Sequence, residues 1–224
     1  MLLKLLTTIL IFTSLIRTEP STDLLIKETR EKIAQINLSF LEKNTPNESF
    51  VNQLGKLLSE LKEKKNIAGS ISNENEYKNK TDNLIKSFKA FEKFYRSKPA
   101  VDTLKKVFRG VNNEFNTLFG NYFLDELKNS SKKKIIIFST SMSCECTLEM
   151  CYKQETEIQK LQKDNSGLFD YAVVDCFTNF DLQSKYEVGF IPMVLVMDKK
   201  GREVKRFARE ENLYSELNKY LMEK

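Results

Sequence analysis

The chain has 224 residues, of which 41% are hydrophobic, so it can bury the core of one large domain or two small ones. Its 36 basic and 31 acidic residues leave a net charge of +5, which is too mild to indicate a nucleic-acid-binding protein. The sequence contains no His, which excludes Ser-His and Cys-His catalysis and His-ligated metal sites.

The first 20 residues predict a targeting segment. After Lys4 the chain runs through about 12 mainly apolar residues before Arg17 and Pro20, near the core length of a signal peptide and short of the roughly 20 residues that span a bilayer. We therefore expect residues 1–20 to be a signal peptide or an uncleaved anchor, although a buried helix or an organellar presequence would also fit this pattern. No later segment is apolar enough to cross a membrane.

A signal peptide would place the protein in the secretory pathway, in the ER lumen or outside the cell, or in a periplasm. Disulfides persist in such compartments. Triplets of the form N-x-Ser/Thr agree weakly with a lumenal location, since chance alone gives about two in so Asn-rich a chain. They begin at Asn37, Asn47, Asn79 and Asn129.

Residues 21–131 predict an all-α region of about four helices, because they contain no Cys and no run typical of a strand. Apolar residues recur at helical spacing, as in Leu84, Phe88, Phe91 and Tyr95, and such stripes more often form a bundle core than a peptide-binding groove. We expect a binding or dimerisation module, so a homodimer is a possible assembly. The predicted helices begin near Ser21, near Asn47 or Thr45, near Glu74 and at Pro99.

Residues 132–224 hold all four Cys and alternate between strand and helix patterns. The polar stretch 128–134 that precedes them predicts a short linker. The order βαβαββα predicts a mixed sheet with helices on both faces. The expected elements are strands at 134–138, 168–174, 192–197 and 203–207, and helices at 145–163, 180–186 and 210–222.

Several of these patterns occur together in the order of one known family. A strand that ends at Phe138 is followed by a Cys-containing turn that opens a helix. Later come Tyr-x-Val-x-x-Ile-Pro at 186–192, an apolar strand and a Lys-Lys-Gly turn. Residues 132–224 therefore resemble the thioredoxin-like superfamily, which includes thioredoxins and protein disulfide isomerases. The resemblance implies a minimal thioredoxin-like α/β fold, a cis bond between Ile191 and Pro192 that faces the cysteines, protein thiols or disulfides as substrates, and no cofactor.

The sequence also departs from that family. Cys144-Glu145-Cys146 replaces the usual Cys-x-x-Cys, and the chain has no Trp. No strand is predicted before Lys134, so the first strand of full thioredoxins is missing, hidden or replaced by the helical region.

Spacing limits which cysteines can pair. Cys144 and Cys146 point to nearly opposite sides of a regular helix, but in a turn before the helix they can approach closely enough for a strained disulfide. Cys151 lies too far along a helix to reach Cys144 and is little better placed for Cys146, so it stays a secondary candidate for an additional disulfide. Cys176 follows the second strand, so a bond from Cys176 to Cys144 or to Cys146 is an alternative pairing.

These observations predict a thiol–disulfide oxidoreductase or isomerase of an oxidising compartment. Cys144 and Cys146 are the expected catalytic pair, because a helix N-terminus lowers the pKa of a thiol, although the charge of Glu145 would raise it. One alternative is a redox-inert interaction or scaffold protein with the same fold. Another is a thiolate metal-binding protein, which the Cys-x-Cys-x4-Cys spacing disfavours; we expect no metal site.

Overall fold

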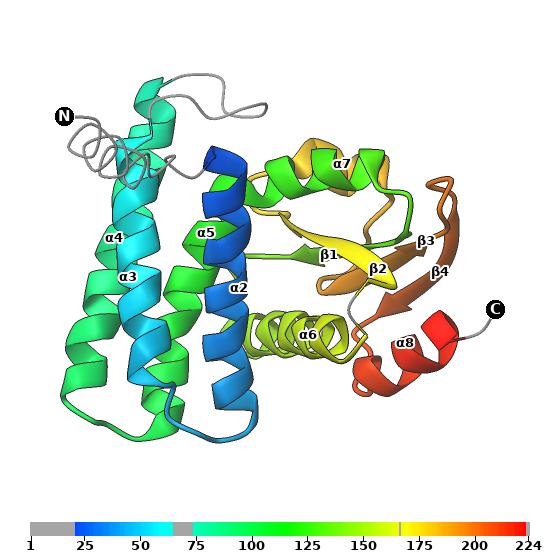
Figure 1. The fold of residues 1–224 in the computed structure, drawn as a ribbon. Coiled ribbons are helices and arrows are strands. Elements are labelled where there is room, and N and C mark those ends of the chain that lie inside the picture. Colours follow the sequence, from blue (N-terminus) through cyan, green and yellow to red (C-terminus); the bar gives the residue numbers. More distant parts are fainter. Residues whose placement is uncertain (1–20, 65–73, 166, 223–224) are drawn as a thin grey trace, which may run out of the picture.

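The computed structural model describes residues 21–64, 74–165 and 167–222. The predicted leader at residues 1–20 lies outside this range. A group of long helices stands beside a four-stranded sheet that has helices on both faces (Figure 1). Within the described ranges, no helix is both long and apolar enough to span a membrane.

The helical part begins where the capping residues predict. Ser21 precedes the first helix and accepts a hydrogen bond from the Leu24 amide through its side chain. Asn47 caps the second helix in the same way, through the Ser49 amide. Pro99 lies two residues before the last of the four. These helices are α2 (Thr22–Leu41), α3 (Glu48–Glu63), α4 (Glu74–Arg96) and α5 (Val101–Asn129).

The aromatic stripes of these helices form their common core, as expected. Phe88 and Phe91 of α4 are buried, and the Phe91 ring lies edge-on to Phe108 of α5 with 4.8 Å between ring centroids. Tyr95 is partly buried and donates its hydroxyl to the Pro46 carbonyl at 2.9 Å. The stripes therefore stabilise the bundle rather than line a groove.

The C-terminal part has the predicted mixed sheet, with strand order β2-β1-β3-β4. The first two strands run parallel, and each later strand is antiparallel to its neighbour. This topology confirms the thioredoxin-like fold. The elements are β1 (Lys133–Ser139), α6 (Glu145–Asp164), β2 (Phe169–Asp175), α7 (Phe180–Lys185), β3 (Met193–Met197), β4 (Glu203–Ala208) and α8 (Leu213–Met222).

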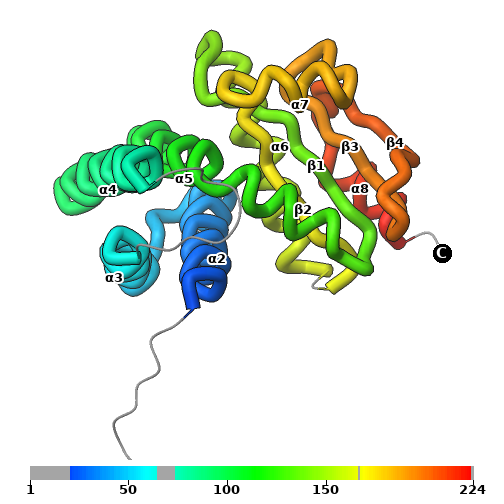
Figure 2. The backbone as a smooth tube through the Cα atoms, turned by 90° about the horizontal axis from the view of Figure 1, so that it is seen from above, coloured from blue at the N-terminus to red at the C-terminus, as the bar shows by residue number. Residues whose placement is uncertain are grey.

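Successive strand residues point to opposite faces of the sheet and enter two separate cores. Ile135 and Ile137 pack against α6 and α8 on one face. Ile136 and Phe138 join a larger core on the other face, which also contains the buried residues of α2–α5. The helical part and the sheet therefore share one core, and Figure 2 shows α5 and α2 beside the sheet, with α3 and α4 further from it.

β2 is an edge strand of the sheet. Helices α5 and α2 pack against it, which explains why no further strand is needed there. A Cβ atom on Gly120 of α5 would lie only 2.6 Å from the Val173 carbonyl oxygen, so glycine permits a close approach of helix to strand. From α2, Arg30 donates Nη1 to the Tyr171 carbonyl at 3.0 Å. No strand precedes β1 in the described ranges, and the helical region occupies the outer side of β2.

The predicted linker is a short, ordered connection. Only three residues separate α5 from β1. Ser130 donates its hydroxyl to Asp170 at 2.6 Å, and Lys132 forms an ion pair with the same carboxylate at 3.0 Å. Lys134 is buried and reaches the Lys128 carbonyl.

Candidate functional site

Cys144 lies at the start of α6, directly after the loop that leaves β1. It occupies the N-cap position with extended backbone angles (φ −63°, ψ 154°), and Glu145 is the first helical residue. Asp175, at the end of β2, holds this loop by accepting hydrogen bonds from the Ser141 amide at 3.0 Å and the Ser141 hydroxyl at 2.7 Å. Cys144 is thus presented at the carboxyl ends of two parallel strands.

The structure brings Cys144 and Cys146 together. Both side chains are exposed free thiols, and their sulfur atoms lie 2.6 Å apart. The two sulfur atoms can approach each other because the Cys144 backbone is extended rather than helical. The sequence predicted this, since cysteines two residues apart cannot meet inside a regular helix. A disulfide bond would shorten the separation to about 2.05 Å.

The surroundings of Cys144 favour its thiolate. The Cys146 thiol, and then the hydroxyl and backbone amide of Thr147, lower the pKa of Cys144 to about 6. The Thr147 Oγ1 atom lies 3.2 Å from the Cys144 sulfur. Cys144 is exposed to water, so loss of hydration opposes the charge less than these hydrogen bonds favour it. These contacts therefore favour the thiolate, which is the reactive state of a thiol.

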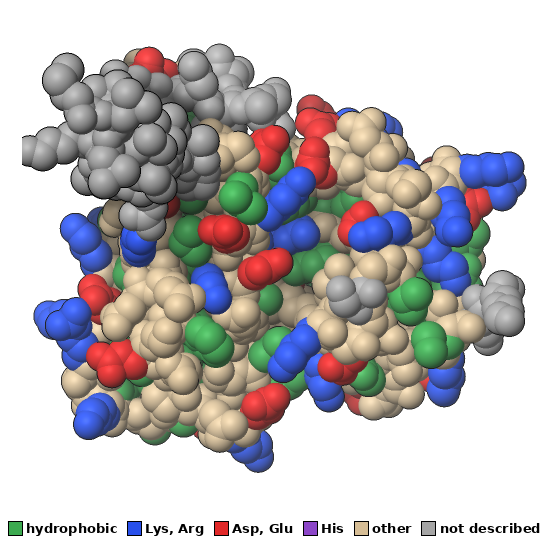
Figure 3. Space-filling model, in the orientation of Figure 1, with side chains coloured by type: hydrophobic (Ala, Val, Ile, Leu, Met, Phe, Trp, Pro, Cys, Tyr) green, Lys and Arg blue, Asp and Glu red, His purple; other side chains and the backbone are tan. Residues whose placement is uncertain are grey.

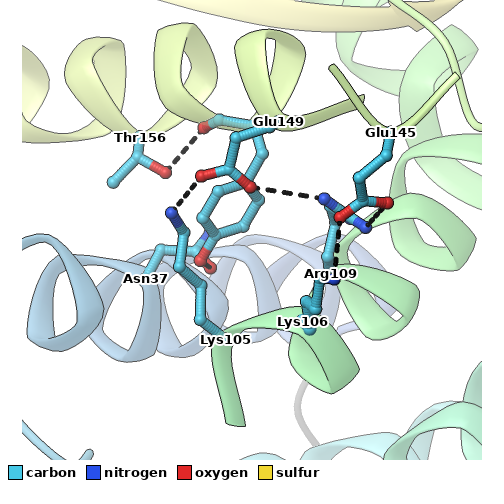
Figure 4. A network of polar contacts seen from close by, with 8 residues as sticks. Asn37, Lys105, Lys106, Arg109, Glu145, Glu149 and Thr156 are labelled. Atoms are coloured by element: carbon cyan, nitrogen blue, oxygen red, sulfur yellow. Dashed lines mark hydrogen bonds and ion pairs between the residues drawn. The ribbon is translucent and has the colours of Figure 1, made fainter. Parts of the chain in front are cut away.

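The negative charge of Glu145 was expected to oppose this ionisation, but basic side chains of α5 balance it. It forms ion pairs with Arg109 at 2.8 Å and Lys106 at 3.4 Å, and these partners lower the pKa of Glu145. One turn further along α6, Glu149 pairs with Arg109 and Lys105. Figure 4 shows these α5 cations facing the first turns of α6. The sequence alone did not reveal this pairing, because the partners lie some 40 positions apart on different elements.

The Ile191–Pro192 bond is cis, as the resemblance implied. Met193, the next residue, pairs with Phe138 near the end of β1. Pro192 therefore lies at the end of the sheet from which the Cys144 loop departs. The Arg209 amide donates to the Pro192 carbonyl at 3.1 Å and fastens this loop to the end of β4.

Cys151 and Cys176 differ from the first pair, since both are buried free thiols. Burial raises the pKa of Cys151 and, with the nearby Asp175 charge, raises that of Cys176 to about 12. The alternative pairing of Cys176 with Cys144 or Cys146 is not formed. In the described ranges, no group of three or more Cys, Asp or Glu side chains is arranged to hold a metal ion.

Large apolar side chains are exposed on the segments that follow β1 and β2 and on the segment that precedes the cis proline. Met142 lies in the Cys144 loop, Phe177 and Phe180 follow β2, and Phe190 precedes the cis proline. All four are exposed, Met142, Phe180 and Phe190 by more than 60%. We call these four residues the apolar rim. On the face in Figure 3, by contrast, basic and acidic side chains are interspersed.

A buried polar cluster between α5 and α6 was not predicted from the sequence. Glu155 accepts hydrogen bonds from Asn112 at 2.8 Å, from Asn116 at 3.0 Å and from Gln159 at 3.3 Å. Burial nevertheless raises the pKa of Glu155 to about 7. Asn37 of α2 completes the cluster, with no exposed surface and hydrogen bonds to Asn112 and Gln159. The glycosylation triplet at Asn37 is therefore inaccessible in the folded protein.

No protein-family model matches the chain, and no curated protein sequence matches it significantly. Among solved structures, mitochondrial thioredoxin 3 of Saccharomyces cerevisiae in its oxidised form is 16% identical, over 45% of this chain and 86% of that one, with a TM-score of 0.36. Fasciola hepatica thioredoxin is 21% identical over 44% and 88%, also with a TM-score of 0.36. The germline-specific thioredoxin Deadhead of Drosophila melanogaster is 16% identical over 46% and 94%, with a TM-score of 0.39.

Proposed function

We propose that the thioredoxin-like part of this chain exchanges thiols and disulfides with polypeptide substrates, using Cys144 as the attacking sulfur and Cys146 as the resolving thiol. The observation that carries the proposal is the position of Cys144. Its sulfur is exposed at a helix N-terminus, 2.6 Å from a second thiol, and has a pKa near 6. A reactive cysteine needs this combination of access and ionisation.

The reaction begins with attack of the Cys144 thiolate on one sulfur of a substrate disulfide. The substrate S–S bond breaks, one substrate thiolate leaves and takes up a proton, and a mixed disulfide forms with Cys144. Cys146 then loses its proton and attacks the Cys144 sulfur, which releases the second substrate thiol. Two electrons have passed from the cysteine pair to the substrate, and the Cys144–Cys146 disulfide remains. Run in reverse, the same steps oxidise a substrate dithiol.

The apolar rim supports polypeptides as the substrate class. Exposed apolar side chains gathered at one place mark interaction surfaces. Met142 and Phe190 come from the two loops that carry Cys144 and the cis proline, and we propose that a polypeptide segment binds across these two loops. We further propose an oxidising compartment, on the basis of the apolar run in residues 1–20.

The test measures reduction of a disulfide-bonded polypeptide such as insulin, and refolding of a scrambled disulfide protein, with the whole chain. Cys144→Ser should lose nearly all activity, while Cys146→Ser should accumulate a mixed disulfide visible by mass spectrometry. Cys151→Ala is the matched control, since it removes a thiol of the same helix that is buried. If the wild type is no faster than free thiol, the redox-inert scaffold alternative replaces this proposal.

A further inference from the structure

The third residue after Cys144 places a hydroxyl beside the reactive sulfur. The side chains at the N-cap and three residues later lie on the same side of a helix start and commonly form hydrogen bonds with one another's backbone. Here Cys144 takes the first position and Thr147 the second, and their Sγ and Oγ1 atoms lie 3.2 Å apart. In the described ranges, the Cys146 sulfur has a hydrogen-bond contact only with Cys144.

We propose that Thr147 is the positioning residue that selects Cys144, rather than Cys146, as the attacking sulfur. The inference rests on the proposed function, because it names the group that determines which cysteine attacks. Thr147 acts on Cys144 by donating its hydroxyl proton to the sulfur, and Cys146 receives no such donor.

A threonine at this position stabilises the reduced state of the cysteine pair more than the disulfide state. The hydroxyl can donate to a thiolate, and hydrogen bonds to charged groups are roughly twice as strong as those between neutral groups. Threonine has no thiol, so Thr147 cannot take part in a disulfide. When Cys144 is bonded to Cys146 or to a substrate, its sulfur is neutral and the hydrogen bond weakens. Thr147 therefore stabilises the reduced pair and makes the Cys144–Cys146 disulfide the more oxidising species.

The first experiment measures the pH dependence of Cys144 alkylation by iodoacetamide in a Cys146→Ala background, where Cys144 is the exposed thiol. Thr147→Val keeps the size and the amide but removes the hydroxyl. We expect its alkylation midpoint to move to higher pH, with a rate about fivefold lower below both midpoints and an unchanged rate above them. Thr147→Ser should restore the profile.

The second experiment uses the intact cysteine pair and its equilibrium with glutathione. Thr147→Val should shift that equilibrium about fivefold toward the Cys144–Cys146 disulfide, and Thr147→Ser should not. Thr147→Ala repeats both measurements in case valine disturbs the helix start, with circular dichroism reporting the fold. An unchanged midpoint in both the Val and Ala variants overturns the proposal. Neither readout requires turnover, so a chain without exchange activity can still show the Thr147 effect, and the two proposals fail separately.

Discussion

Helix α6 and its N-cap carry two acidic groups whose pKa values the protein shifts in opposite directions. At the N-cap of this helix, the exposed Cys144 has its pKa lowered to about 6. In its third turn, the buried Glu155 has its pKa raised to about 7. On the same helix, a thiol is thus a stronger acid than an ordinary cysteine and a carboxyl is a weaker acid than an ordinary glutamate. The surroundings at each position shift the two pKa values in opposite directions.

The number of hydrogen-bond donors does not explain this difference. Glu155 receives hydrogen bonds from Asn112, Asn116 and Gln159, whereas the Cys144 sulfur lies closest to the Cys146 thiol and the Thr147 hydroxyl. Desolvation separates the two sites, because a buried anion loses the hydration that an exposed one keeps. Arg30 of α2 lowers the pKa of Glu155, but less than burial raises it.

The largest expected contrast along α6 is between Cys144 and Cys151. At pH 7, iodoacetamide should label Cys144 at least about 100-fold faster than Cys151, because the pKa of Cys144 is lowered to about 6 whereas burial raises that of Cys151 above its ordinary value of 9.0. Burial of Cys151, which is 2% exposed, slows its reaction further. Mass spectrometry of the labelled peptides gives both rates. In denaturant the two rates should converge; comparable labelling in the folded protein would contradict the assignment.

The next expected effect concerns Glu155 and pH. Its ordinary pKa is 4.5 and its folded value is about 7, so between these values the folded protein binds more protons than the unfolded chain. Glu155 therefore makes the free energy of unfolding fall as pH rises. Its contribution is most favourable below about pH 4.5 and is lost by about pH 7, a change on the order of 3 kcal/mol.

Glu155→Gln should remove this dependence, because the amide stays neutral at every pH. We expect the free energy of unfolding of the variant, relative to wild type, to rise between pH 5 and pH 8 in urea titrations. The difference between the two proteins cancels the other titrating groups. Glu42→Gln is the control, since it changes an exposed carboxylate at the end of α2. A relative stability that stays constant with pH would show that Glu155 is already ionised at pH 5.

The contrast along α6 also marks what the sequence could predict. Apolar periodicity and capping residues predicted the elements from α2 to α8, and the cysteine turn was found because Cys144 and Cys146 stand where a strand pattern gives way to a helix pattern. Glu155 was missed because Gln154, Glu155 and Gln159 look like a solvated helix face. Packing of α5 and α2 buries Glu155 and Gln159, and Gln154 reaches the Glu210 carbonyl between β4 and α8. Nothing in the local pattern records such distant contacts.

The smallest expected effect concerns the charge beside Cys144. Glu145 lies next to the thiol and should raise its pKa, but Arg109 and Lys106 already pair with it. In Glu145→Gln, Lys106 loses this ion pair and Arg109 keeps only its pair with Glu149, so both cations favour the thiolate more strongly. We expect the alkylation midpoint of Cys144 to move to lower pH, by less than Thr147→Val moves it upward, because both groups are exposed and water screens them.

Two controls, one at high salt and one at a neighbouring carboxylate, distinguish this effect of the Glu145 charge from the Thr147 hydrogen bond. The shift in Glu145→Gln should disappear at 1 M salt, where the screening length falls to about 3 Å, whereas the Thr147 effect should persist because it is a direct hydrogen bond. Glu149→Gln is the matched control, since Glu149 also pairs with Arg109 but lies one turn further from Cys144. It should move the midpoint less than Glu145→Gln. A shift to higher pH in Glu145→Gln would instead mean that the ion pair with Arg109 holds the first turn of α6 in the geometry on which the Cys144 thiolate depends.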